Sequence, residues 1–231
     1  LKHACLQNKV NLDLQWIDAD DFDVEDIANL DGVVVPGGFG VRGIEGKISA
    51  IQYLRENKIP FLGICLGLQC AVIEFARNVC GISEANSSEF SQNTKDFVID
   101  LLPNQDLDKD DVGASMRLGT YPCKITKGTL TSEIYNDEVI YERHRHRYEV
   151  NNKYRDVLEK NGLVFSGLSP DNNLVEMIEL TDHPFFVASQ FHPEFKSRPW
   201  EPAPVFNKFI QSASAFVKKT STTHSKTRVK D

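Results

Sequence analysis

The stretch FLGICLG, residues 61–67, places a cysteine between two glycines at the junction of two predicted elements. Its first four residues suit a short strand buried on both faces, and residues 66–77 place apolar side chains at helical spacing. Glycines two positions before and after Cys65 relieve the crowding of a sharp turn and leave the central side chain projecting from the strand. The pattern predicts a nucleophilic thiol, whose thiolate the first N–H groups of the helix would favour.

Such a thiol needs a base, because only a few per cent of a free thiol is ionised at pH 7. The best candidate is His192, in the stretch QFHPEF of residues 190–195. It follows an apolar run predicted to be a strand, so it lies at a carboxyl end, where ligand sites of open α/β sheets collect. Glu194 can turn back to accept a hydrogen bond from the imidazole. The other histidines lack this setting.

Attack by the thiolate would create an oxyanion, which needs hydrogen-bond donors. The stretch VPGG of residues 35–38 ends another predicted strand, and its two glycines allow a close approach of the backbone to a substrate. We expect the N–H groups of Gly38 and Leu66 to form the oxyanion hole. A plain flexible loop is the competing interpretation of these glycines. A phosphate-binding loop is disfavoured, since no Gly-Lys-Ser/Thr follows.

The order of predicted elements indicates an α/β protein. Strands at 33–35 and 61–64 alternate with helices at 46–57 and 66–77, which is typical of a parallel sheet. The second half is richer in strands, expected at 97–102, 120–126, 139–148, 163–168, 175–180 and 185–191, before a closing helix at 203–217. The acidic residues 13–31 suggest a short strand, a loop and a short helix. We therefore expect a central, mostly parallel sheet flanked by helices, with added antiparallel β structure.

Composition and charge exclude several classes of function. The chain has 231 residues, 41% hydrophobic and 26% charged, as in folded globular proteins. A formal net charge of −7 argues against general nucleic-acid binding. No apolar run approaches the roughly 20 residues that span a bilayer, so we expect no membrane association. Five cysteines without a C-x-x-C pair disfavour a disulfide framework and a structural zinc site. We expect no metal and a cytoplasmic location.

The motifs together resemble class I glutamine amidotransferase domains. The resemblance rests on VPGGFG (35–40), GICLGLQ (63–69) and FHPE (191–194). Further stretches are similar to the glutaminase half of the CTP synthase family, namely GASMRLG (113–119), ERHRHRYEVN (142–151), ANSSEF (85–90) and FKSRP (195–199). It covers nearly all of residues 12–217 and implies a flavodoxin-like fold of three layers.

The resemblance also implies the roles of individual residues. It implies a catalytic triad of Cys65, His192 and Glu194, and contacts between the substrate L-glutamine and Gly38, Leu66, Gln69, Glu89 and Arg147. The chemistry agrees, because Glu89 can hold the ammonium of a free amino acid and the forked guanidinium of Arg147 can hold its carboxylate. Arg143, Arg145 and Arg147 alternate, so a solvated or interface face of a strand would explain these arginines equally well.

Domain organisation and partners follow from the same resemblance. It implies one amidotransferase domain over residues 1–217, apparently without the family's first strand, and a disordered tail over residues 218–231. No cofactor is expected in this domain. The family's synthetase domain, absent here, uses ATP and Mg²⁺ to aminate UTP with the released ammonia. The full-length family is activated by GTP and forms a homotetramer.

Two other functions stay open. A cysteine hydrolase that cleaves γ-glutamyl or peptide bonds would share the fold and the nucleophile. A pocket closed at both ends by Glu89 and Arg147 argues against it, since such a pocket should reject peptides. A degenerate regulatory module is the second alternative, and the complete set of Cys65, His192 and Glu194 argues against it.

Overall fold

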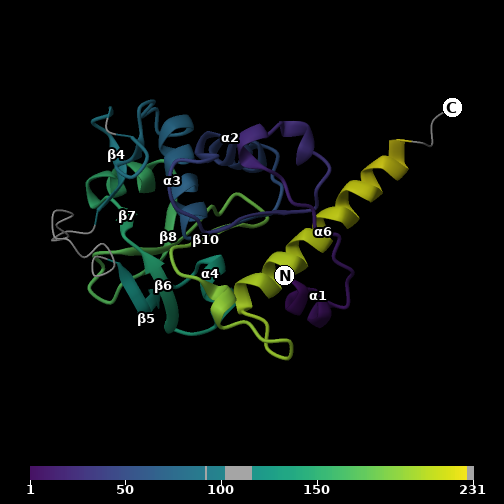
Figure 1. The fold of residues 1–231 in the computed structure, drawn as a ribbon. Helices are drawn as coiled ribbons and strands as arrows, with labels where there is room; N and C mark the ends of the chain where they lie inside the picture. Colours follow the sequence, from purple (N-terminus) through teal and green to yellow (C-terminus); the bar gives the residue numbers. More distant parts are fainter. Residues whose placement is uncertain (92, 102–115, 228–231) are drawn as a thin grey trace.

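The structure, a computed structural model, describes residues 1–91, 93–101 and 116–227 (Figure 1). The α-helices are α1 (Lys2–Asn8), α2 (Ile44–Glu56), α3 (Leu66–Asn78), α4 (Leu130–Tyr135), α5 (Arg155–Lys160) and α6 (Pro204–Thr227). The strands are β1 (Val33–Val35), β2 (Phe61–Ile64), β3 (Asn86–Ser87), β4 (Phe97–Leu101), β5 (Arg117–Ile125), β6 (Val139–His146), β7 (Tyr148–Val150), β8 (Val164–Leu168), β9 (Val175–Glu179) and β10 (Phe186–Ser189). Residues 113–115 of the stretch GASMRLG lie outside the described residues.

The main sheet has the strand order β1-β2-β10-β9-β8-β5-β6. Strand β2 lies between β1 and β10 and runs parallel to both. Its four residues are buried, which agrees with its continuous apolar sequence. The segments that follow β1, β2 and β10 therefore emerge at one edge of the sheet. The α/β architecture predicted from the sequence is confirmed.

The sheet is less parallel than the sequence suggested. Only β1, β2 and β10 form parallel pairs in the main sheet among the described residues, whereas β9, β8, β5 and β6 continue it in antiparallel pairs. The reason is the length of the connections. A parallel neighbour needs a crossover of a dozen or more residues, and the turn between β8 and β9 spans only residues 169–174. The sheet is thus mixed rather than mostly parallel.

The long strand expected at residues 139–148 is interrupted at Arg147. Strand β6 pairs with β5 in the main sheet, but β7 pairs with β4 in a second sheet of order β3-β4-β7. The chain bends at Arg147 because it passes from one sheet to the other. The three arginines expected on one strand face are therefore divided, with Arg143 and Arg145 exposed on β6 and Arg147 half-buried in the bend.

The strand expected within residues 13–31 is absent. The segment forms two short 3₁₀ helices, η1 (Ala19–Asp21) and η2 (Val24–Asp26). Asp18 accepts a hydrogen bond from the backbone N–H of Asp20, and Asp23 begins a capping box. Aspartate side chains that bond their own backbone in this way favour caps and turns over strands. The aspartates of this segment therefore help to determine its local backbone.

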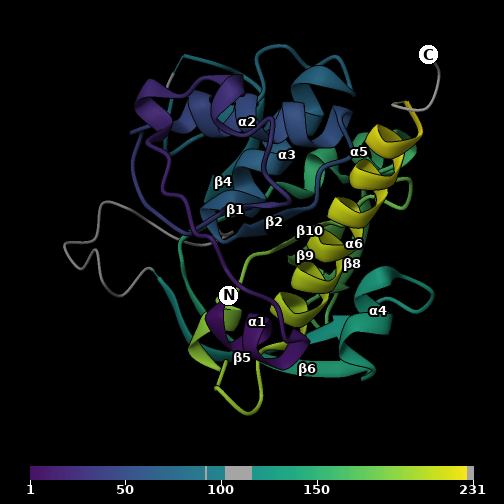
Figure 2. The same ribbon diagram turned by 90° about the vertical axis from the view of Figure 1, so that its right-hand side faces the viewer.

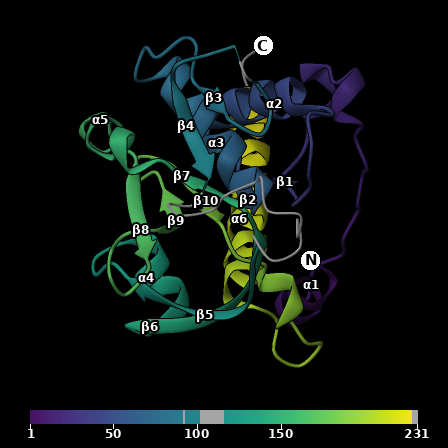
Figure 3. The same ribbon diagram turned by 60° about the vertical axis from the view of Figure 1, so that its left-hand side comes forward.

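Helices cover both faces of the sheet in three layers (Figure 2). Helices α2 and α3 pack on one face, where the cluster of buried residues includes Phe61 and Phe186. Helices α1 and α6 pack on the other face, where the buried cluster includes Leu62 and Val187. Neighbouring residues of one strand thus serve opposite layers, because side chains alternate along a strand. Figure 3 shows β3 and β4 of the second sheet beside α3.

Helix α6 continues to Thr227, well beyond the end expected at residue 217. Residues 228–231 of the predicted tail lie outside the described residues. None of the helices in the described ranges combines the length and the apolar character needed to cross a membrane.

Candidate active site

Cys65 occupies a strained turn between β2 and α3. Its φ of 54° and ψ of −102° lie where L-residues are rarely found. Two neighbouring glycines permit this backbone. A Cβ atom on Gly63 would lie 2.8 Å from the Cβ of Ala188, and one on Gly67 would lie 2.1 Å from the carbonyl oxygen of Val35. The glycines at both positions are therefore required by close backbone packing, and the turn holds the thiol at the end of the strand.

The thiol of Cys65 lies in a desolvated place. The residue is 3% exposed, and burial raises the pKa of its thiol to about 12. Hydrogen bonding to the backbone N–H of Leu66 lowers the pKa, while the charges of Glu194, Glu149 and Glu89 raise it. The helix N-terminus was expected to favour the thiolate, but desolvation outweighs that effect. The thiol therefore needs a base and further hydrogen-bond donors before it can act as a nucleophile.

His192 lies beside Cys65. A Cβ atom placed on Gly37 would lie 2.9 Å from Cε1 of His192 and 3.5 Å from Cβ of Cys65, so the imidazole and the thiol flank the same point. The Nδ1 atom of His192 lies 2.6 Å from Oε1 of Glu194. Its Nε2 atom is buried and has no hydrogen-bond partner among the described residues. The structure thus brings Cys65, His192 and Glu194 together, with one ring nitrogen oriented by a carboxylate and the other available for a proton.

Backbone hydrogen bonds hold Cys65 and His192 in place. The N–H of Cys65 donates to the carbonyl of Ser189 over 2.7 Å, and the N–H of His192 donates to the carbonyl of Arg143 over 2.8 Å. The His192 ring also stacks on Phe195, with centroids 5.3 Å apart. Cys65 is thereby attached to the end of β10, and His192 to β6.

The loop after β1 approaches the start of α3. A Cβ atom on Gly38 would lie 3.0 Å from Cδ2 of Leu66, so the two expected oxyanion donors are on neighbouring segments. The N–H of Gly40 donates to Oε1 of Glu89 over 2.9 Å. This bond brings Glu89, from the loop between β3 and β4, to the glycine loop. Arg147 occupies the bend between β6 and β7.

Gln69 connects that bend to Cys65 through Gln190. Its Nε2 donates to the carbonyl of Tyr148 over 3.1 Å and to Oε1 of Gln190 over 3.3 Å. The Nε2 of Gln190 in turn lies 3.7 Å from the sulfur of Cys65. The residues expected around a bound glutamine therefore lie on segments that meet near the thiol. Gln190 was not among the residues predicted from the sequence, although its position directly after β10 and two residues before His192 is a usable signal.

Comparisons with known proteins agree with this geometry. The profile of the family "Glutamine amidotransferase class-I" matches residues 1–212 of the chain. The chain belongs to this family. The CTP synthase of Caldanaerobacter subterraneus is 60% identical to the amidotransferase over 216 residues, which are 92% of this chain and 40% of that protein. The CTP synthase of Geobacillus kaustophilus is 58% identical over 217 residues, covering 92% and 41%. The amidotransferase therefore spans about two fifths of the length of these curated relatives.

Solved structures point the same way. The glutaminase domain of Trypanosoma brucei CTP synthase with bound acivicin matches the amidotransferase with a TM-score of 0.86 and 39% identity, covering 93% of this chain and 85% of that one. A GMP synthase subunit from Thermoplasma acidophilum matches with a TM-score of 0.61 at 17% identity, covering 95% and 90%. The second likeness concerns the fold alone.

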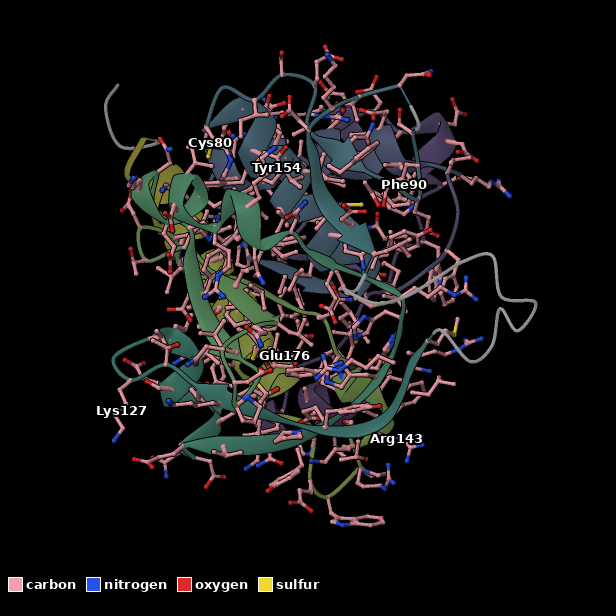
Figure 4. The ribbon with its side chains drawn as sticks, turned by 90° about the vertical axis from the view of Figure 1, so that its left-hand side faces the viewer. Cys80, Phe90, Lys127, Arg143, Tyr154 and Glu176 are labelled. Atoms are coloured by element: carbon pink, nitrogen blue, oxygen red, sulfur yellow. The ribbon has the colours of Figure 1, made fainter. Side chains whose placement is uncertain are left out.

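The structure also contains a buried cluster of charged and polar side chains that the sequence did not predict. Arg117 lies 2.7 Å from Glu176 and 3.4 Å from Glu149, and all three side chains are buried. Nδ1 of His144 lies 2.9 Å from Nε2 of His146 on the buried face of β6. Figure 4 shows Glu176 within the molecule, whereas Lys127 projects from its surface. The alternation of arginine with histidine in β6 was the available signal for this cluster.

Burial controls the ionisation of this cluster. It lowers the pKa of His144 to about 2 and that of His146 to about 3, helped by the positive charge of Arg117. Both imidazoles are therefore neutral at pH 7. Burial also raises the pKa of Glu149 and Glu176, and the charge of Glu176 raises that of Glu149 further. No group of three or more histidine, cysteine or acidic side chains in the described part of the chain is arranged to hold a metal ion.

Proposed function

We propose that this domain hydrolyses L-glutamine to glutamate and ammonia through a γ-glutamyl thioester on Cys65. The observation that carries the proposal is the grouping of the strained Cys65 with His192 and Glu194 at the edge of the sheet. Family membership and the likeness to a glutaminase domain with bound acivicin support it.

The first half of the reaction forms the thioester. Nε2 of His192 takes the thiol proton, and the sulfur attacks the side-chain carbonyl carbon of glutamine. The N–H groups of Gly38 and Leu66 stabilise the oxyanion of the tetrahedral intermediate. Collapse of that intermediate breaks the C–N bond, and the imidazolium gives its proton to the departing nitrogen, which leaves as ammonia.

The second half releases glutamate. His192 takes a proton from water, and the resulting hydroxide attacks the thioester carbonyl. The C–S bond then breaks, and the sulfur leaves as the thiolate or, after return of the proton, as the thiol. Glu194 accepts a hydrogen bond from Nδ1–H throughout and stabilises the imidazolium in each half.

Recognition of the amino acid is assigned to the rim of the site. Glu89 holds the α-ammonium, Arg147 holds the α-carboxylate, and Gln69 contacts the substrate beside the sulfur. The bond between Gly40 N–H and Glu89 supports this assignment, because it keeps a carboxylate at the glycine loop. A pocket that engages both α-substituents should reject a glutamine whose α-groups are in peptide bonds.

The domain is proposed to act within a longer CTP synthase. Its ammonia would pass to a synthetase domain that aminates UTP with ATP and Mg²⁺, with GTP as an activator and a cytoplasmic homotetramer as the assembly. The names and lengths of the curated relatives support this context. No cofactor is proposed for the domain itself.

We propose that residues 1–217 form the amidotransferase domain and that residues 218–231 are a tail outside it.

A cavity of about 1180 Å³ lies beside β1, lined by apolar side chains that include Val33, Trp16 and Phe209. Strand β1 ends the main sheet. An additional strand placed along β1 would fill this cavity.

Labelling and hydrolysis together test the function. Acivicin should modify Cys65, located by mass spectrometry, and Cys65→Ala should abolish glutamine hydrolysis. Cys70→Ala, a matched change further along α3, should retain most of the activity. Equal losses in both variants would contradict the assignment of Cys65.

A γ-glutamyl peptide separates the remaining alternatives. We expect glutamine to be hydrolysed. A peptide whose γ-glutamyl residue has its α-amino and α-carboxyl groups blocked should be left intact. Efficient hydrolysis of the peptide would favour a general cysteine hydrolase. No reaction of Cys65 with acivicin and no hydrolysis of either substrate would favour a regulatory module.

A further inference from the structure

Gln190 lies against the nucleophile and has no role in the mechanism described so far. Its side chain is 0% exposed, and its Nε2 atom lies 3.7 Å from the sulfur of Cys65. Water has no access to such a side chain, so the amide must be satisfied by the protein. A negative sulfur at this place would therefore have a fixed donor on one side.

The orientation of the Gln190 amide follows from its neighbours. The carbonyl of Tyr148 can only accept a hydrogen bond, so the atom of Gln69 that faces it, 3.1 Å away, is the amide nitrogen. The same nitrogen lies 3.3 Å from Gln190, which must present its oxygen there. The nitrogen of Gln190 is then the atom that faces Cys65. Gln69 thus sets the direction in which Gln190 donates.

The backbone around Gln190 is held on both sides. Its own N–H donates to the carbonyl of Glu176 over 2.8 Å, and Glu176 lies in the interior (Figure 4). The preceding residue, Ser189, accepts from the N–H of Cys65, and the base His192 is two residues further on. Gln190 lies one residue beyond the end of β10 and two residues before His192, so the segment that follows β10 brings both side chains to the thiol.

We propose that Gln190 is a further catalytic residue, whose side-chain N–H donates a hydrogen bond to the thiolate of Cys65 and so stabilises the reactive form. A hydrogen bond to a charged acceptor is about twice as strong as a neutral one. It compensates in part for the burial and for the carboxylates that disfavour a negative sulfur. The same bond stabilises the sulfur when it departs from the thioester. This inference rests on the proposed role of Cys65 as nucleophile.

The pH dependence of alkylation tests the bond directly. Iodoacetamide reacts with the thiolate, and mass spectrometry gives the rate at Cys65 across the pH range. The Gln190→Met variant keeps the length of the side chain and removes the donor. In this variant the midpoint of the pH profile of alkylation at Cys65 should rise by about one pH unit. The rate at neutral pH should fall about tenfold. A merely structural role would lower rates through disorder without moving the midpoint. The half-buried Cys80 in the same sample serves as the internal control, and its profile should stay unchanged.

Gln190→Glu provides the second variant. It has the shape of glutamine and retains an oxygen for Gln69, but it places a carboxylate oxygen at the sulfur, so the midpoint should rise at least as far as in Gln190→Met. An unchanged midpoint in either folded variant would overturn the proposal. Alkylation needs no glutamine, so this result is independent of the proposed function, which fails instead if Cys65→Ala still hydrolyses glutamine.

Discussion

The imidazole of His192 and the carboxylate of Glu194 are joined by a contact of 2.6 Å between Nδ1 and Oε1, although the two residues are only two positions apart in the chain. The short 3₁₀ helix η4 (Pro193–Phe195) produces this contact, because it turns the chain back immediately after the histidine. The ring is oriented with its other nitrogen on the buried side. The base of the proposed reaction is therefore positioned by local structure.

Glu194→Gln should lower the rate of glutamine hydrolysis about a hundredfold. The amide oxygen can still accept from Nδ1–H, but the negative charge that stabilises the imidazolium is lost. The effect should appear in kcat, measured by glutamate release, with an unchanged thermal unfolding midpoint. Glu201→Gln, at an exposed position before α6, is the control and should leave kcat unaltered. A Glu194→Gln enzyme with the native kcat would contradict the positioning role of this carboxylate.

Glu89→Gln should weaken glutamine binding while sparing the chemistry. The amide retains an oxygen that accepts from the N–H of Gly40, so the glycine loop keeps its contact. The charge that holds the substrate ammonium is removed, and KM should rise about 10- to 100-fold with little change in kcat. Steady-state kinetics with glutamine measure both. An unchanged KM would exclude Glu89 from the ammonium site.

Gly67→Ala should destabilise the fold. The added Cβ would lie 2.1 Å from the carbonyl oxygen of Val35, and backbone at that distance cannot move aside cheaply. We expect a loss of about 2–4 kcal/mol in the free energy of unfolding, measured with urea. Gly81→Ala is the control, since its Cβ meets open space and only its φ of 73° is unfavourable, so it should cost about 1 kcal/mol. Equal losses would refute the packing argument.

Arg117→Met should show how strongly the buried carboxylates destabilise the fold when they are unpaired. Without the guanidinium, Glu149 and Glu176 remain buried and unpaired, and the protein should lose about 3–5 kcal/mol of stability at pH 8. Arg117 lowers the pKa of both buried carboxyl groups, so its removal raises these pKa values and lets the folded variant bind protons at pH 5 that neutralise the unpaired charges. The loss should therefore be smaller at pH 5 than at pH 8. Urea unfolding at the two pH values measures this difference.

Arg42→Met is the control for that experiment. Arg42 pairs with Asp18 and Asp20, but its side chain is 78% exposed, and an exposed pair adds little to stability. The free energy of unfolding of Arg42→Met should differ little from that of the native protein, and by the same amount at pH 5 and at pH 8. A pH-independent loss in Arg117→Met would mean that the arginine contributes packing rather than charge.

Glu142→Gln should stabilise the protein at alkaline pH. Burial raises the pKa of Glu142 to about 7 from an ordinary value of 4.5, despite the nearby Lys196. Because the pKa of Glu142 is higher in the folded state, the protonated carboxyl group contributes stability below pH 4.5. That contribution is lost as the pH rises to about 7. Glutamine does not titrate, so the stability of the variant relative to the native protein should grow by about 2–3 kcal/mol across this range. Glu133→Gln, at an exposed position on α4, is the control and should show no such growth. If the stability difference between Glu142→Gln and the native protein does not change with pH, the pKa of Glu142 is not raised.

The sequence by itself determined most of the elements and the local motifs of the site. Alternating strands and helices identified the parallel core, and the glycines around Cys65 identified the turn that presents it. Those signals are local: a strand with two buried faces must be continuously apolar, and a sharp turn tolerates no Cβ. The contact between His192 and Glu194 is local as well, which is why the stretch FHPE was informative.

Only the tertiary structure decided which polar side chains lie beside the sulfur. Gln190 and the cluster of Arg117, Glu149 and Glu176 depend on contacts between strands far apart in the chain, so the local sequence pattern could not show which groups they contact. The same holds for the bend at Arg147. The chain bends there because β6 pairs in the main sheet and β7 pairs in the second sheet. The ionisation of Cys65 is also a tertiary property. Helix position favours the thiolate, but the depth of burial, set by all the layers together, is the larger effect.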